Sequence, residues 1–421
     1  MSQCGCFEQT LHYVSPSHGG WGVVRIAALV PESHHLFVCP FACGRHTALG
    51  GEMNGIKEQV SYLFIDEADI ISGDYEQMII NGVDDLFEGL DKIPKVLFIF
   101  TACLDDLLGT DHEPILAELS EKYPDVQFRH CKMNPISLDS KLPPGVTLQM
   151  NMYSLLEKST EQKNTVNLIG INTVAKNGDL RDILAQKGYR LLHISEYDRF
   201  EDFREMSSSK LDILAGPAAK MASKDMEKNL GIPTVEGYVT YREQDIDAFY
   251  TRLSEALGEE LLPLTAPYRD KARQKIAEAK AVIGDYPIAV DYQAVLRPFS
   301  LALMLAENGF RVAMVASDGI PAFEQENYEK LMELVPDLLL VNPLHHDSVK
   351  FGLTDKDFLC IGFDCGYITA SDKVANLMED DYMYGYDGVC RLMDMLIAAF
   401  NEKADVSEMI EKAGLIIWAD F

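Results

Sequence analysis

Short apolar runs alternate with helical patterns in three parts of the chain. Each apolar run is typical of a strand buried on both faces of a parallel sheet, and the segment after it repeats apolar positions every three or four residues, as a helix does. Such alternation predicts strand–helix–strand units. The units cover residues 61–70, 75–90 and 96–103, then 165–172, 179–188 and 189–195, and last 286–292, 298–309 and 310–317.

The second and third units resemble each other, since QKGYRLLHIS and ENGFRVAMVAS share a helix end, a glycine, an aromatic residue, an arginine and a strand. We therefore expect an α/β protein with three Rossmann-like domains and mainly parallel sheets. Polar and charged segments near positions 150 and 270 mark the boundaries. The predicted domains are residues 1–150, 151–270 and 271–421.

No first strand is followed by G-x-G-x-x-G, and no G-x-x-x-x-G-K-[ST] is present, so the fold class does not imply nucleotide binding. The net charge of −29 opposes binding to nucleic acid or to anionic membranes. We find no long uncharged apolar stretch and no basic-then-apolar signal at the N-terminus. These features predict a cytoplasmic protein without a membrane span, and the acidic surface would attract a basic partner.

Cysteine carries the candidate chemistry. The nine cysteines are an odd number without an export signal, which argues against a disulfide framework. Scattered thiolates suit an iron–sulfur cluster, whereas zinc favours paired C-x₂-C spacings, which are absent. Buried structural thiols are the alternative. Five of the nine lie in the first 103 residues, namely Cys4, Cys6, Cys39, Cys43 and Cys103.

Two of these cysteines follow predicted strands. Cys103 lies three residues after the apolar run 97–100, and Cys43 lies shortly after the run 34–38. Because sites in open α/β sheets form outside the carboxyl ends of strands, we expect Cys43 and Cys103 to lie close together. The N-terminal segment with Cys4 and Cys6 would then fold over them.

Other polar residues have simpler interpretations. Asp105 and Asp106 are expected to cap the helix after Cys103, and His112 to form a hydrogen bond near the thiols. The pairs His34-His35 and His345-His346 are interpreted as solvated loop residues. Cys390 is expected in the core, with Cys131, Cys360 and Cys365 in strand or helix contexts.

The order of an N-terminal cysteine, then HHLFVCPFACG, then FTACLDDLLGTD resembles the nitrogenase component 1 family. IDEADIISGDYEQM, MEKNLGIPTVEG and YGYDGVCRLMDMLIAAF extend the resemblance along most of the chain. It implies that Cys6 or Cys4 is the first cluster ligand, Cys43 the second and Cys103 the third. Cys39 and the remaining N-terminal cysteine are extra thiols, either additional ligands or packed residues.

The resemblance implies a [4Fe–4S] or larger P-cluster-like centre. It also implies an ATP-dependent iron-protein-like reductase as electron donor, and a homodimer or a paralogous subunit. The chain would pass low-potential electrons to a substrate in an interdomain cleft, with catalytic residues unknown. The alternative is a non-catalytic scaffold for metal-cluster assembly.

The chain departs from the family at the ligands of the large catalytic cofactor. The position of the family's cysteine ligand falls at Ala215, and the stretch 373–388 holds no histidine. A cofactor held in the family's usual way is therefore not expected.

Overall fold

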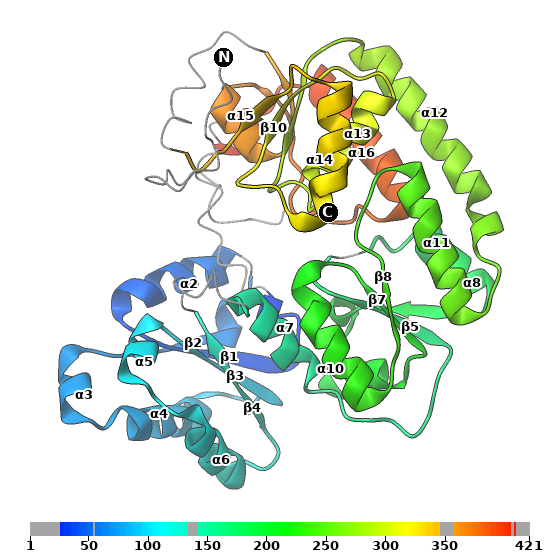
Figure 1. Ribbon diagram of the computed structural model, residues 1–421. Helices are drawn as coiled ribbons and strands as arrows, with labels where there is room; N and C mark the ends of the chain where they lie inside the picture. The colour runs from blue at the N-terminus through cyan, green and yellow to red at the C-terminus, as the bar shows by residue number, and fades with distance from the viewer. Residues whose placement is uncertain are drawn as a thin grey trace. The chain divides into compact units, whose positions relative to one another are not determined.

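The computed structural model describes residues 26–53, 55–133, 142–172, 174–345, 357–405 and 408–409 (Figure 1). Their backbone forms two compact units. The N-terminal unit contains residues 26–171 and 192–234, and the C-terminal unit contains residues 172–191 and 235–409. Cys4 and Cys6 lie outside the described residues.

The first sheet lies in the N-terminal unit and has the strand order β2-β1-β3-β4. Its neighbouring strands are all parallel, and Val38 of β1 pairs with Thr101 of β3, so the carboxyl ends of β1 and β3 lie at one edge. The strands are β1 (Ser33–Cys39), β2 (Val60–Phe64), β3 (Val96–Thr101) and β4 (Gln127–Lys132).

Helices α4 and α6 pack on one face of this sheet, with Ile79 and Leu119 against Leu97 and Ile99 (Figure 1). All six residues of β3 are buried, which explains why the strand is apolar without alternation. The helices of this segment are α2 (Phe41–Met53), α3 (Glu67–Ser72), α4 (Tyr75–Gly89), α5 (Cys103–Leu108), α6 (His112–Lys122) and α7 (Pro144–Tyr153).

The second sheet has the order β6-β5-β7-β8, and β5 and β7 are parallel. Its strands are β5 (Thr165–Ile169), β6 (Arg190–Leu192), β7 (Leu211–Leu214) and β8 (Thr234–Glu236). The helices of this segment are α8 (Asp179–Gln186), α9 (Phe200–Phe203), α10 (Lys220–Leu230) and α11 (Glu243–Leu257).

The third sheet lies in the C-terminal unit, has the order β11-β10-β9-β12-β13 and is parallel throughout. Helices α12 and α16 pack along each other. The strands are β9 (Ile288–Asp291), β10 (Val312–Ala316), β11 (Leu339–Val341), β12 (Leu359–Ile361) and β13 (Lys373–Ala375). The helices are α12 (Ala266–Ile283), α13 (Pro298–Glu307), α14 (Gln325–Leu334), α15 (Phe363–Thr369) and α16 (Gly385–Asn401).

The predicted α/β class with mainly parallel sheets is confirmed. Each sheet lies within one predicted domain, but the two compact units have other limits, so the three-domain division stays a prediction. Within the described ranges, we find no helix of the length and apolarity that a bilayer span requires.

The interpretation of His34 and His35 as solvated loop residues is wrong. Both lie in β1 and are buried, at 5% and 0% exposure. His34 forms a hydrogen bond of 2.9 Å with Ser61, and the ring of His35 stacks on Phe100. A central parallel strand excludes water from both faces, so polar side chains there need partners inside the protein.

Candidate functional site

Three cysteines of the N-terminal unit gather at the carboxyl ends of β1 and β3. Cys39 is the last residue of β1, Cys43 lies in the first turn of α2, and Cys103 is the first residue of α5. All three are free thiols; Cys39 is buried, whereas Cys43 and Cys103 are half-buried. The adjacent strand ends bring Cys43 and Cys103 together, as the sequence predicted.

Electrostatics support this proximity. Burial and the neighbouring Cys103 thiol raise the pKa of Cys43, while burial and Cys43 raise the pKa of Cys39 to about 12. For Cys39 and Cys43, burial is the larger cause and the neighbouring thiol adds to it, so both pKa shifts favour the protonated thiol. A bound metal reverses this preference, because it binds the thiolate form directly. Cys43 and Cys103 thus have the chemistry of soft metal ligands.

A buried polar network surrounds Asp105, which lies two residues after Cys103 in α5. Its carboxylate accepts hydrogen bonds from the Tyr75 hydroxyl at 3.0 Å and from His112 Nε2 at 2.8 Å to Oδ1 and 2.9 Å to Oδ2. Asp105 and His112 are 3% and 8% exposed. Burial alone would raise the pKa of Asp105, but the bonds and charge from His112 outweigh it and lower that pKa.

Thr101 and His130 complete this group. We call its five residues the Asp105 network: Tyr75, Thr101, Asp105, His112 and His130. Thr101 Oγ1 lies 3.3 Å from Asp105 Oδ2 and 2.9 Å from His130 Nε2. The imidazole rings of His112 and His130 stack at 3.6 Å between centroids. Burial, followed by the His112 charge, lowers the pKa of His130 to about 4, so this imidazole is neutral near pH 7.

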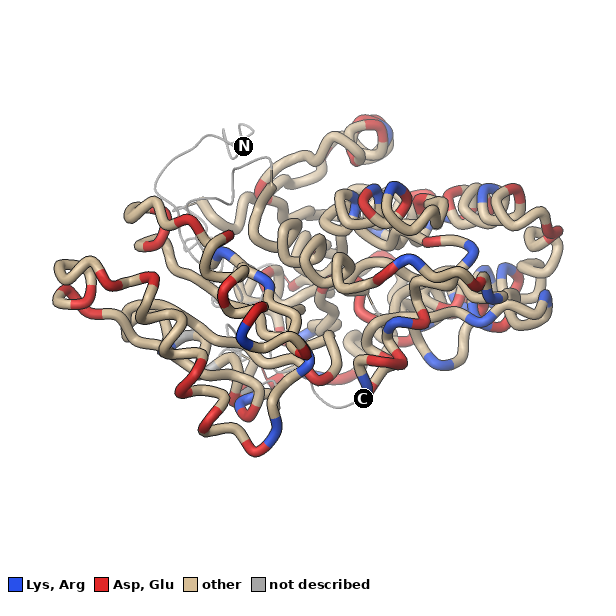
Figure 2. The backbone as a smooth tube through the Cα atoms, turned by 90° about the horizontal axis from the view of Figure 1, so that it is seen from below, with Lys and Arg blue, Asp and Glu red and all other residues tan. Residues whose placement is uncertain are grey.

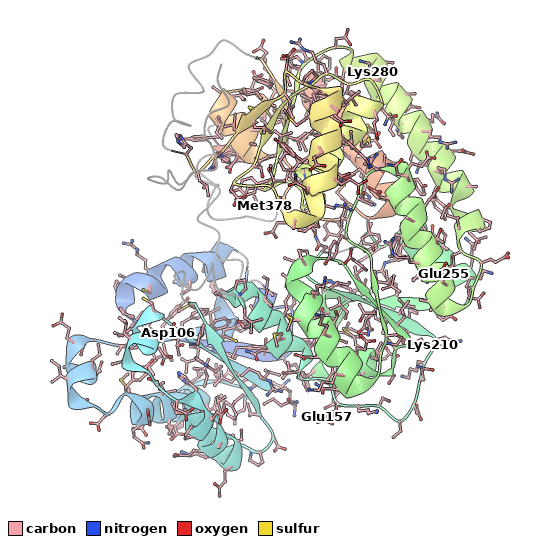
Figure 3. All side chains as sticks on the ribbon, viewed as in Figure 1. Asp106, Glu157, Lys210, Glu255, Lys280 and Met378 are labelled. Atoms are coloured by element: carbon pink, nitrogen blue, oxygen red, sulfur yellow. The ribbon has the colours of Figure 1, made fainter. Side chains whose placement is uncertain are left out.

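The expectation that Asp105 and Asp106 cap α5 is wrong. The N-cap residue is Ala102, and it makes no side-chain capping bond. Asp105 turns inward instead, and Asp106 forms an ion pair of 2.5 Å with Lys132 (Asp106 is labelled in Figure 3). A helix with Asp in its first turn has a favourable dipole interaction without a cap, so the same letters fit both arrangements.

Sequence reasoning anticipated a hydrogen bond from His112 but missed Tyr75, Thr101 and His130 as its companions. Thr101 and His130 end or nearly end two neighbouring strands, β3 and β4. Their position at the carboxyl edge of the sheet was the available signal. Tyr75 had none, because it begins a helix 30 residues away from Asp105.

The position of the family's cysteine ligand to the large cofactor is filled by a packed alanine. Ala215 directly follows β7 and is completely buried. In the C-terminal unit, the stretch 373–388, where the family's histidine ligand is expected, contains no histidine. Neither Ala215 nor this stretch offers the thiolate or imidazole that the family uses there.

The remaining described cysteines are core residues. Cys131, Cys360, Cys365 and Cys390 are at most 4% exposed. Burial raises the pKa of Cys390 to about 11, as expected for an apolar environment. The expectation of a core position for Cys390 is confirmed.

The chain is thus an α/β protein with three mainly parallel sheets and with free thiols at the carboxyl ends of strands in the first sheet. The family of nitrogenase component 1 type oxidoreductases matches residues 19–401, and the chain belongs to this family.

Two solved structures titled "Nitrogenase Cp1" share the fold. The one at pH 6.5 has a TM-score of 0.69 and 17% identity over 96% of this chain and 95% of that chain. The one at pH 5 has a TM-score of 0.64 and 15% identity over 94% and 89%.

A curated relative is the nitrogenase iron-molybdenum cofactor biosynthesis protein NifE of Clostridium pasteurianum. It is 21% identical over 239 residues, which are 55% of this chain and 51% of that protein. The match thus spans about half the length of this relative.

Proposed function

We propose that this chain is an iron–sulfur oxidoreductase subunit that accepts low-potential electrons from an ATP-dependent iron-protein-like reductase. Membership of the nitrogenase component 1 type family supports this proposal. The electrons would pass on to a substrate. The observation that carries the proposal is the convergence of Cys43 and Cys103 at neighbouring strand ends.

The residues of the N-terminal unit fit a [4Fe–4S] or P-cluster-like group. Cys43 and Cys103 offer soft sulfur donors, Cys6 or Cys4 would supply a further one, and Cys39 is a candidate for an additional one. The group supplies one-electron transfer when bound. The chain's contribution is to hold the thiols on rigid element ends and to shield them by burial.

A homodimer or a paralogous subunit would complete the ligand set, since three thiols per chain leave a four-iron group short of ligands. Around the thiols, large apolar side chains are exposed to solvent. Phe41, Phe64 and Leu107 are 68%, 44% and 83% exposed, and the rings of Phe41 and Phe64 touch at 5.1 Å between centroids. Exposed apolar groups of this kind favour a protein partner.

A second candidate is a scaffold that assembles and releases metal clusters. The similarity to a cofactor biosynthesis protein favours it, as do Ala215 at the position of the family's cysteine ligand and the lack of histidine in residues 373–388. Such a carrier would use the same cysteines but would not turn over a small substrate.

The first test is the iron and sulfide content of protein purified without oxygen, with electron paramagnetic resonance of the reduced state. We expect Cys43→Ala and Cys103→Ala each to lose most of the iron, because a missing thiolate leaves iron open to solvent. Cys390→Ala is the matched control and should keep its iron, because this thiol is packed in α16. Unchanged iron in both of the first two variants would contradict the assignment.

A further inference from the structure

A group of nitrogen and oxygen donors, separate from the cysteines, also lies in the N-terminal unit. A ligand atom of Asp105, one of His112 and one of His130 all lie within 4.8 Å of one another. The three residues come from α5, the start of α6 and β4, so three elements converge on one point. Two imidazoles and a carboxylate are the donors that divalent zinc or iron takes in three-ligand protein sites.

We propose that Asp105, His112 and His130 bind a single divalent transition ion, such as Zn²⁺ or Fe²⁺, at a site separate from the cysteines. The nitrogen and oxygen donors differ in chemistry from the thiols, so the two sites select different metal ions. This inference does not depend on the proposed function.

The pair of Asp105 and His112 requires little rearrangement for binding. His130 must rotate out of its stack on His112, because nearly parallel rings at 3.6 Å between centroids cannot both direct a nitrogen lone pair at one ion. His112 Nε2 lies 2.8 Å and 2.9 Å from the two Asp105 oxygens. An ion bonded to both residues at about 2.0–2.2 Å in tetrahedral geometry separates its ligand atoms by roughly 3.4 Å. The imidazole and carboxylate therefore need to part by about half an ångström, with the ion taking the place of the hydrogen-bonded proton.

The surroundings match those of metal-binding carboxylates and imidazoles. Tyr75 donates to Asp105 Oδ1, and Thr101 Oγ1 is within 3.3 Å of Oδ2, so outer hydrogen bonds fix the carboxylate. His130 contributes its ligand atom from β4. It lies on the edge strand β4 and is half-buried, which leaves an entry path from solvent.

A purely structural role is the competing explanation, since a buried aspartate with hydrogen-bonding partners also stabilises a fold. The two explanations differ in what an added ion does. A structural network has no saturable binding, whereas an ion site binds with a stoichiometry and a spectrum set by its ligands.

The test is anaerobic titration of metal-free full-length protein with Co²⁺, followed by visible absorption, with Zn²⁺ added afterwards as competitor. Cobalt bound by nitrogen and oxygen shows ligand-field bands without the near-ultraviolet sulfur-to-cobalt charge-transfer band that thiolates produce. We expect a saturable signal of the first kind, lost on adding Zn²⁺. It should persist in Cys103→Ser, which removes a thiol but no ligand of this site.

Variants then locate the signal. His112→Ala and His130→Ala should lose it, and Tyr75→Phe should weaken Co²⁺ binding by about 10–100-fold through the outer shell. His34→Ala is the matched control, a buried histidine of the same sheet, and should bind Co²⁺ like the unmodified chain. If the alanine variants do not fold, Tyr75→Phe is used in their place. Zn²⁺ should then raise the melting temperature of Tyr75→Phe less than it raises that of the unmodified chain.

Three outcomes would overturn the proposal: no saturable Co²⁺ signal, a signal only of the thiolate type, or equal binding by His112→Ala and the unmodified chain. Loss of iron–sulfur content in Cys43→Ala with Co²⁺ binding retained would separate this site from the proposed cluster. A cluster-free protein that still binds Co²⁺ through these residues would support the ion site while contradicting the proposed function.

Discussion

At Gly385 the backbone itself requires glycine. Its φ is +63°, and a Cβ there would lie 2.3 Å from Asp179 Oδ2. That oxygen accepts hydrogen bonds from the Tyr386 amide at 2.8 Å and from the Tyr250 hydroxyl at 3.0 Å. Asp179, the first residue of α8, thus satisfies a free amide at the start of α16, where a carboxylate also meets the positive end of the helix dipole.

We expect Gly385→Ala to lower the free energy of unfolding by about 3 kcal/mol or more, because it combines a left-handed backbone with displacement of a buried carboxylate. Gly188→Ala is the control: its φ is +79°, but a Cβ added there would meet no atom within 4 Å. It should lose only about 1–2 kcal/mol. Urea denaturation followed by circular dichroism gives both values, and equal losses would remove the role assigned to Asp179.

Between elements, a buried polar pair joins β5 and β7. Asn167 and Asp212 are directly opposite in the parallel register, and Asn167 Nδ2 donates to Asp212 Oδ1 at 2.8 Å. Both side chains are completely buried. Burial raises the pKa of Asp212 to about 8, so the carboxyl is protonated near pH 7 in the folded chain.

The raised pKa predicts a stability that falls with rising pH. The unfolded carboxyl loses its proton near pH 4, whereas the folded one keeps it until about pH 8. Between these values the folded state binds the extra proton, so each pH unit costs about 1.4 kcal/mol. Asp212→Asn should remove this slope and gain about 4 kcal/mol relative to the unmodified chain on going from pH 5 to pH 8.

Chemical denaturation at several pH values tests this expectation. Glu227→Gln is a control, because Glu227 contributes to the raised pKa but is itself exposed. It should leave most of the slope in place. Parallel pH profiles for the unmodified chain and Asp212→Asn would show that the carboxyl titrates normally in the folded state.

Some features of the fold could be predicted from the sequence, and others could not. Apolar runs such as 96–101 predicted the strands and their parallel class, because burial on both faces leaves a plain hydrophobic signal. Strand-end logic also predicted that Cys43 and Cys103 lie together. The inward turn of Asp105 and the burial of His34 and His35 could not be predicted, since tertiary partners from other elements decide them.

At the scale of the whole molecule, apolar side chains beside the thiols predict self-association or pairing with a paralogue. Leu107 is 83% exposed on α5, directly after Asp106. We expect Leu107→Glu to shift the sedimentation coefficient toward the monomer without lowering the melting temperature, because little buried area is lost within the chain. Val282→Glu on α12, at a site 42% exposed, is the control and should leave the oligomer intact. A monomer that holds a complete cluster would contradict the prediction.

Charge is unevenly distributed along the chain. The net charge is −29, and residues 66–125 contain sixteen acidic but only three basic residues. Figure 2 shows acidic positions in red along this part of the N-terminal unit, at the left of the view. The thiols lie in the same unit, so a partner that delivers electrons there meets an acidic surface.

Electron delivery should therefore depend on both ATP and salt. In the proposed function the reductase carries the ATP, and the sequence of this chain contains no G-x-x-x-x-G-K-[ST] loop. Attraction between the acidic unit and a basic partner surface speeds encounter, and salt screens it within about 8 Å at physiological ionic strength. We expect stopped-flow reduction of the anaerobic protein by a candidate iron-protein-like reductase to require ATP and to slow as salt rises.

Asp85→Asn and Glu88→Gln on α4 should flatten the salt dependence, whereas Asp270→Asn on α12 of the other unit should not. Equal rates without ATP would contradict the proposed coupling, and reduction without turnover of any small substrate would favour the scaffold.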